Sequence, residues 1–298
     1  MQLDRGRWPR SGGRRRAALL VIAAVAAIEA AAVGSANARP SPRAANPFAS
    51  AALRDYLDQR GGNVTAAAYD VNSGVTYLYR PGVREQTASI VKVDILATLL
   101  HERQARGGLS AEQRGVAQGM IEASDNDDAT TLWNEAGGAS AVQAFDDRAG
   151  MDQTSANVAW GLTTTTPLDQ LKLLRLVMLP NDLLDLASRE YECELMRSVI
   201  PFDRWGVSAG LGQNATVALK NGWLPVAAGW QVNSIGQVTG SGRRYLIAVM
   251  TNEDPSEGFG IATIERISGA AWQALAGQTL LKLAPPAKGR GFPAPPTE

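Results

Sequence analysis

The sequence predicts an α+β protein, in which an antiparallel sheet of about five strands is flanked by helices and joined to an all-helical subdomain. Residues 64–69 and 75–79 have strand character and flank an Asn-Ser-Gly turn, which is typical of a β-hairpin. The stretch from about 89 to 200 has mostly helical periodicity. Strands from both ends of a chain usually meet in one sheet, so the middle is predicted to form the second subdomain. The late strand-like stretches are 216–223, 230–238 and 245–251.

Helices are predicted on both sides of these strands. Residues 50–59 have apolar side chains at helical spacing, and 261–283 form a last amphipathic helix. The cleft between a sheet subdomain and a helical subdomain is a preferred place for a small ligand. The expected core positions of the last helix are Ile264, Ile267, Trp272, Leu275 and Leu280. The expected boundaries are 50–88 plus 205–284 for the sheet subdomain and 89–204 for the helical one.

The first 38 residues resemble an export signal. Six arginines precede an apolar run at 17–28 that is too short to cross a bilayer, and an A-x-A cleavage site follows at 36–38. We expect export to the extracellular or cell-wall space without a stable membrane anchor; an uncleaved anchor is the alternative. The pair Arg15-Arg16 is a weak indication of the twin-arginine route. In chain order, the expected parts are the signal peptide (1–38), a flexible lead-in (39–49), the folded domain (50–284) and a disordered proline-rich tail (285–298).

Composition excludes several classes of function. Acidic and basic residues balance at 29 each, and loss of 1–38 would leave a net charge of −4, so no nucleic-acid surface is expected. The single Cys193 cannot form an internal disulfide, and one His101 cannot build a His/Cys metal cage. No phosphate-binding or dinucleotide-binding glycine motif occurs. We therefore expect no metal and no cofactor, and proton chemistry from carboxylates, lysine, serine or tyrosine.

The segment Ser89-Ile90-Val91-Lys92 opens the helical region. Residues three apart on a helix share a face, so the Lys92 amine can reach the Ser89 hydroxyl. Taken alone, the pair is compatible with a capping serine and a solvated lysine. The chain, however, has 24 arginines and only five lysines, so a lysine is used where an amine that can lose its proton is needed.

Two further polar motifs follow. Ser124-Asp125-Asn126 lies in a break between helices, where it is either a helix cap or a hydroxyl and an amide that can relay a proton and hold a carbonyl. Lys220-Asn221-Gly222 lies on a strand, and a glycine there often marks the close approach of a ligand or another backbone. The alternative is an edge strand protected by lysine.

The three motifs, in this order and at these separations, resemble those of the serine β-lactamase and penicillin-binding-protein superfamily, especially the class A β-lactamases. The resemblance covers about residues 50–283. It implies that Ser89 is the acylated nucleophile and Lys92 its proton partner. It also implies a β-lactam or a small peptidoglycan-derived substrate, and we expect a monomer. Further implied roles are a proton relay at Ser124, substrate contacts at Asn126, Lys220, Asn221 and Gly222, and an oxyanion hole from the backbone N–H groups of Ser89 and Trp223.

Two departures from that pattern stand out. Asn221 occupies a position where the family has Thr or Ser for the substrate carboxylate. The loop after Gly150 is short and lacks the family's glutamate that activates the deacylating water; Asp152 is its only acid. His101 lies about 18 Å from Ser89 along the same helix and is expected to be a solvated helix-end residue. Cys193 is expected to be a small packed side chain.

These observations predict an exported serine hydrolase of the β-lactamase type that is acylated on Ser89 and deacylates slowly. The first alternative is a D,D-peptidase of the penicillin-binding-protein type, which acts on cell-wall peptides. The second, from a different class, is a non-catalytic binding or sensing module on the same fold.

Overall fold

The structure is a computed structural model that describes residues 46–60 and 63–276. The predicted signal peptide, the proline-rich tail and Leu280 lie outside the described residues. Within these ranges, no helix has both the length and the apolar character that a membrane span requires.

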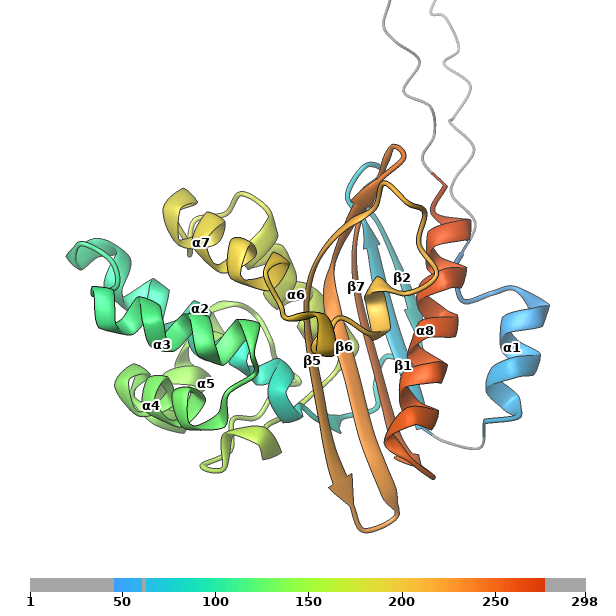
Figure 1. Cartoon of the computed structure of the whole chain (residues 1–298), viewed down its shortest axis with the longest axis horizontal. Coiled ribbons are helices and arrows are strands. Elements are labelled where there is room, and N and C mark those ends of the chain that lie inside the picture. The colour runs from blue at the N-terminus through green and yellow to red at the C-terminus, as the bar shows by residue number, and fades with distance from the viewer. Residues whose placement is uncertain (1–45, 61–62, 277–298) are drawn as a thin grey trace, which may run out of the picture. The chain divides into compact units, whose positions relative to one another are not determined.

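The centre of the protein is a five-stranded antiparallel sheet with the strand order β2-β1-β7-β6-β5 (Figure 1). The late strands form two successive antiparallel hairpins, with a register shift between Trp230 and Val232 in the second, and the early hairpin joins them through β1. The α+β class expected from the sequence is therefore confirmed. The strands are β1 (Asn63–Asp70), β2 (Val75–Tyr79), β5 (Thr216–Val226), β6 (Gly229–Gly240) and β7 (Arg243–Asp254). The short strands β3 (Glu85–Gln86) and β4 (Thr164–Thr165) form a separate pair.

Helices cover both faces of the sheet. Figure 1 shows α8 and α1 on one side and the other helices on the opposite side. On that opposite side, α6 packs against β7 and β1, and α7 packs against β5. The helices are α1 (Ala51–Asp58), α2 (Val91–Arg103), α3 (Ala111–Glu122), α4 (Asn126–Ala136), α5 (Gly138–Arg148), α6 (Pro167–Met178), α7 (Leu186–Arg197) and α8 (Glu257–Ala274).

Strand β7 shows why the sheet is buried on both faces. Side chains along a strand alternate between its two faces. Tyr245, Ile247 and Val249 belong to the core beneath α8. The intervening Leu246, Ala248 and Met250 belong to the core of the helical side. An uninterrupted apolar run is therefore required, since both faces of this strand exclude water.

Three expectations need correction at particular residues. Phe48, expected in a flexible lead-in, is 3% exposed and packs against Tyr79 with ring centroids 6.5 Å apart. Helix α8 begins at Glu257 rather than at 261, because the Ser256 hydroxyl caps it by accepting from the Phe259 N–H. His101 is half-buried rather than fully solvated: it packs against Phe145, and its Nδ1 lies 2.8 Å from the Leu183 carbonyl oxygen.

Candidate active site

Ser89 lies in a single turn of 3-10 helix, Ala88–Ile90, between β3 and α2. Ala88 has a φ of 47°, a left-handed conformation that costs a non-glycine residue about 1–2 kcal/mol. The preceding backbone is anchored to the sheet, since the Asn233 amide donates to the carbonyl oxygens of Gln86 (2.8 Å) and Thr87 (2.9 Å). The sheet therefore fixes the chain direction just before Ser89, which is half-buried.

Lys92 is completely buried one turn later. Its Nζ donates to the Ser124 carbonyl oxygen (2.6 Å), to Ser124 Oγ (3.3 Å) and to Asn126 Oδ1 (2.7 Å). Among the described residues, no hydrogen bond joins Lys92 to Ser89.

The chain turns sharply between α3 and α4 to present the Ser124 and Asn126 side chains. Ser124 has a φ of 55°, and the Asp125 side chain caps α4 by accepting from the N–H groups of Asp127 and Asp128. The helix-cap interpretation thus applies to Asp125, the middle residue of the motif. The residues on either side of it are left to contact the Lys92 ammonium.

Lys220 reaches the same hydroxyl from the sheet. Its buried Nζ donates to Ser124 Oγ at 2.9 Å and to the Asn221 carbonyl oxygen at 3.1 Å. Burial, together with the nearby charge of Lys92, lowers the pKa of Lys220 to about 7. Burial likewise lowers the pKa of Lys92 to about 8. Two amines that can lose a proton near neutral pH thus converge on one serine hydroxyl.

Asn221 faces away from this cluster. Alternation along β5 places its side chain on the face opposite to Lys220. There its Nδ2 donates to the carbonyl oxygens of Asp203 (2.8 Å) and Trp205 (3.1 Å). A substrate carboxylate would have to displace one of these bonds to use the Asn221 amide.

Gly222 allows β5 to touch the turn that carries Ser89. A Cβ at this position would lie 2.6 Å from the Ser89 nitrogen, 2.8 Å from the Ile90 nitrogen and 2.9 Å from the Thr87 carbonyl oxygen. These are backbone atoms, so they cannot move aside cheaply. The close approach that the sequence suggested is between two backbones, and it places the Trp223 backbone beside that of Ser89.

A pocket of about 350 Å³ opens above Ser89. Ser89 and Asn126 supply its polar lining. Trp160 covers one side: its ring centroid lies 5.1 Å from Lys92 Nζ, and its Nε1 donates to Thr130 Oγ1 at 3.2 Å. The remaining lining residues are apolar or glycine: Ala88, Ala159, Gly161, Leu162, Trp223 and Leu224.

Comparison with known families identifies the family of the chain. A model described as the beta-lactamase enzyme family matches residues 103–275, which is more than half of the chain. The chain belongs to this family. The matched range includes Ser124, Asn126 and Lys220 and begins after Ser89 and Lys92. No curated protein matches the chain.

Solved structures of this family share the fold. A class A beta-lactamase from Mycobacterium abscessus is 24% identical, covers 75% of this chain and 97% of its own, and has a TM-score of 0.65. The structure of PBP-A is 22% identical, covers 75% and 94%, and also has a TM-score of 0.65. A beta-lactamase from Chitinophaga pinensis DSM 2588 is 19% identical, covers 75% and 97%, and has a TM-score of 0.66. Family membership and fold together make the chain a β-lactamase-like serine hydrolase.

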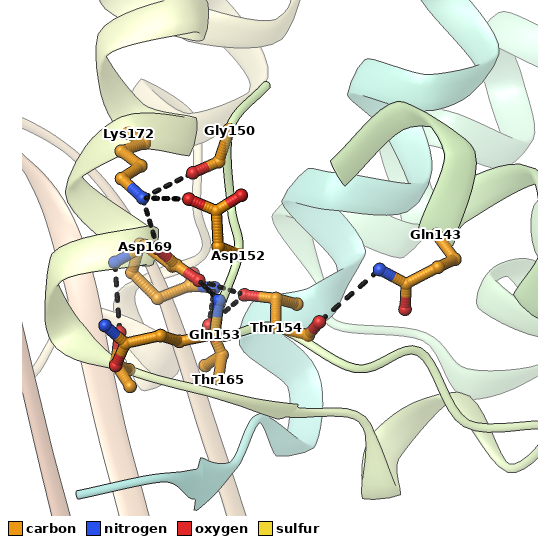
Figure 2. A network of polar contacts seen from close by, with 10 residues as sticks. Gln143, Gly150, Asp152, Gln153, Thr154, Thr165, Asp169 and Lys172 are labelled. Carbon is orange, nitrogen blue, oxygen red and sulfur yellow. Dashed lines mark hydrogen bonds and ion pairs between the residues drawn. The ribbon is translucent and has the colours of Figure 1, made fainter. Parts of the chain in front are cut away.

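The acid of the short loop lies apart from the pocket of this β-lactamase-like protein. The Asp152 side chain is 84% exposed and forms an ion pair of 3.9 Å with Lys172 (Figure 2). Figure 2 also shows Lys172 bound to Asp169, whose carboxylate accepts from the Gln153 N–H and the Thr154 hydroxyl. In the described part of the chain, no carboxylate lines the pocket at Ser89.

Two residues of the site were not identified from the sequence. Asp203 is 3% exposed, and its negative charge raises the pKa of both Lys92 and Lys220 against the effect of burial. The Trp160 ring lies over Lys92 Nζ. Both lie in single turns of 3-10 helix without a motif, so no sequence signal pointed to them. Cys193 is buried, which raises the pKa of its thiol, as expected for a packed side chain.

Proposed function

We propose that the protein is an exported serine hydrolase of the β-lactamase type, acylated on Ser89 by β-lactams and related amides and slow to release the acyl group. Export is supported by the sequence of residues 1–38. The observation that carries the chemistry is the convergence of Lys92 and Lys220 on Ser124 beneath the pocket that holds Ser89.

The proposed reaction uses these groups in order. Neutral Lys92 accepts the Ser89 proton while Ser89 Oγ attacks the substrate carbonyl. The N–H groups of Ser89 and Trp223 stabilise the oxyanion. Ser124 then passes a proton to the leaving nitrogen and is reprotonated from the lysine pair. Asn126 holds the substrate amide once Lys92 releases its oxygen.

Slow deacylation is supported by the lining of the pocket at Ser89, which includes no carboxylate among the described residues. Hydrolysis needs a base that activates water, and the acid of the loop is turned toward Lys172 instead. The same observation is compatible with a D,D-peptidase that transfers or hydrolyses cell-wall peptides, which is the second candidate. A related solved structure is described as an acyl-enzyme complex of a PBP-A mutant with penicillin G. A non-catalytic sensing module is the third candidate.

Intact-protein mass spectrometry after incubation with penicillin G tests this proposal. We expect one covalent adduct per chain in the wild type and none in Ser89→Ala, whose fold should persist because only a hydroxyl is lost. A lasting adduct would support slow deacylation. Equal labelling of both proteins would remove Ser89 from the mechanism, and an unlabelled wild type would favour a non-catalytic module.

A further inference from the structure

The face of the Trp160 ring lies over the Lys92 amine beside the pocket, with 5.1 Å between the ring centroid and Nζ. A cation within about 6 Å of a tryptophan centroid is attracted by the negative face of the ring. The hydrogen bonds of Lys92 go to neutral oxygen atoms of Ser124 and Asn126, and in the described part of the chain no carboxylate lies within ion-pair distance of it. The ring attracts the ammonium and not the neutral amine, so it distinguishes the two protonation states.

A chain of hydrogen bonds holds the ring in this position. The Trp160 Nε1–H donates to Thr130 Oγ1 at 3.2 Å, and the Thr130 hydroxyl donates to the Asn126 carbonyl oxygen at 2.9 Å. Asn126 in turn accepts from Lys92 through its Oδ1 at 2.7 Å. An indole N–H that donates a hydrogen bond leaves more electron density on its ring, which strengthens the attraction of the ring face for a cation. The amine, the two residues of α4 and the ring are therefore one connected unit.

The backbone of the turn that carries the ring is also tied to the segment of the nucleophile. The Thr163 N–H donates to the Trp160 carbonyl oxygen at 3.1 Å. The Thr87 N–H, two residues before Ser89, donates to the Thr163 carbonyl oxygen at 2.8 Å. The ring thus keeps a fixed place relative to the nucleophile as well as to the amine.

The charge of Lys92 forms in surroundings that disfavour it. Burial lowers the pKa of Lys92 to about 8, and the negative charges of Asp125, Asp203 and Asp128 raise it against that effect. The ammonium group of Lys220 repels that of Lys92. Attraction between a cation and a ring face is strongest where water is excluded, as it is around this completely buried amine. The ring is therefore well placed to stabilise the charge.

We propose that Trp160 is a positioning residue for acylation, whose ring face stabilises the ammonium that Lys92 becomes when it accepts the Ser89 proton. The inference rests on the proposed acylation of Ser89 and adds the partner of the charge that this step creates. As the bond from Ser89 Oγ to the acyl carbon forms, the Oγ proton moves to Lys92 Nζ. The bond from the acyl carbon to the leaving nitrogen then breaks, and that nitrogen receives a proton through Ser124. An indole ring face cannot take a proton from water at neutral pH, so Trp160 assists acylation without assisting hydrolysis of the ester.

The proposal predicts that two features of the pH dependence of acylation change together. A weaker ring face lowers the pKa of Lys92, so the midpoint of the rate profile should move to lower pH by about 0.5–1 unit. A less basic amine is also a weaker proton acceptor, so the plateau rate at high pH should fall about two- to threefold. A ring that only filled space would change neither feature.

Fluorination of the ring tests the proposal at nearly constant size. Trifluorotryptophan in place of tryptophan weakens the ring face, because fluorine withdraws electrons. The chain has seven tryptophans, so labelled Trp160→Phe reports the effect of the others. We expect the midpoint of adduct formation with penicillin G to move to lower pH in the labelled wild type and by less than about 0.2 unit in labelled Trp160→Phe. A displacement that is absent, is directed to higher pH or is equal in both proteins would overturn the inference and leave acylation of Ser89 intact. Adduct formation at no pH would overturn both proposals.

A matched pair of threonine variants tests the inference without altering the ring. Thr130→Val removes the acceptor of the Trp160 Nε1–H at nearly constant shape. Thr131→Val is the control, because the Thr131 hydroxyl makes the same kind of bond, to the Asp127 carbonyl oxygen at 2.9 Å. We expect Thr130→Val to move the midpoint to lower pH by up to about 0.5 unit and Thr131→Val to leave it in place. Equal displacements in the two variants, or none in Thr130→Val, would contradict the inference.

Discussion

Two lysine clusters in this protein use the same residue type for opposite purposes. Lys172 is one-third exposed and lies 2.8 Å from the Asp169 carboxylate, so its charge is neutralised by a partner. Lys92 and Lys220 are completely buried, and among the described residues neither has a carboxylate within ion-pair distance. The comparison teaches that scarcity of lysine does not mark a reactive amine. Burial without a close counter-ion marks it, because that lowers the pKa.

The sharpest test of this comparison exchanges each lysine for arginine. Lys92→Arg keeps a positive charge but cannot lose its proton, so acylation by penicillin G should slow by about 10²-fold or more. Lys172→Arg keeps the ion pair and should change the rate by less than about twofold. The rate of adduct formation by mass measures both. Near-normal acylation by Lys92→Arg would reduce Lys92 to an electrostatic role.

Substitutions in the cluster of Lys172 and Asp169 should change the stability of the fold rather than the rate of acylation. Asp169 has no exposed side-chain surface and holds Lys172, the Gln153 N–H and the Thr154 hydroxyl. Asp169→Asn should therefore lower the free energy of unfolding by about 2–3 kcal/mol. Asp152→Asn, at the exposed end of the same cluster, should cost less than about 0.5 kcal/mol. Urea denaturation decides, and equal losses would mean that the network does not depend on burial.

A third cluster is the acidic counterpart of the buried pair Lys92 and Lys220, because it consists of buried carboxyl groups. Asp94, Asp146 and Glu192 meet in the helical core from α2, α5 and α7. Burial raises the pKa of Asp94 to about 7 and that of Asp146 to about 10, with the two carboxyls close enough to share a proton. Burial also raises the pKa of Glu192. The folded state therefore binds more protons than the unfolded state, in which the aspartates titrate near their ordinary values.

The sign of this linkage predicts a loss of stability as pH rises. The stabilisation is fully present below the unfolded pKa and is lost as the pH rises toward the folded values. Stability should therefore fall between pH 5 and 7 by about 1.4 kcal/mol per pH unit for each proton that only the folded state binds, which is about 3 kcal/mol for Asp146 alone. The lysine pair contributes little in that window, because Lys220, with a pKa of about 7, begins to lose its proton only at its upper end. Asp146→Asn should make the loss of stability between pH 5 and 7 shallower. The charges of Asp147 and Asp169, which act on Asp146 in the wild type, remain in this variant. A wild-type stability that rises from pH 5 to 7 would contradict this account.

Much of the architecture follows from patterns that act locally. The apolar run of β7 and the asparagine–glycine turn between the first two strands are sequence signals of a buried strand and of a hairpin. The Ser89, Ser124 and Lys220 motifs were likewise visible, and the structure brings them together. Alternation along β5 could even have shown that Asn221 faces away from Lys220, since neighbouring side chains on a strand point to opposite faces.

Other features of the site depend on contacts that no local pattern encodes. Ala88 and Ser124 adopt left-handed conformations that their residue types do not favour, so the surrounding structure must hold them there. Trp160 meets Lys92 across 68 positions of sequence, and Asp203 acts on both lysines from a separate turn. These relations are products of tertiary packing, which explains why the sequence indicated the nucleophile but not its electrostatic setting.

The smallest expected effect concerns Asp203 and the pH dependence of acylation. Acylation requires neutral Lys92, so its rate should rise with pH through about 8. The negative charge of Asp203 favours the ammonium forms of both lysines, and Asp203→Asn should therefore move the midpoint of the profile to lower pH. The pH dependence of adduct formation in the two proteins measures the displacement. A shift to higher pH would show that Asp203 does not act on the lysine pair as a charge.

The central claim is that Lys92 and Lys220 assist the acylation of Ser89 by a substrate, whereas no carboxylate assists hydrolysis of the resulting ester. Steady-state and burst kinetics with a chromogenic cephalosporin, in the wild type and in Asp152→Asn, test it most directly. We predict a burst of about one product per enzyme followed by a slow steady state, which the variant leaves unchanged; a missing base typically costs 10²–10⁴-fold. Fast turnover that collapses in Asp152→Asn would show that this acid reaches the ester after all, and fast turnover in both proteins would reveal another base and contradict the account.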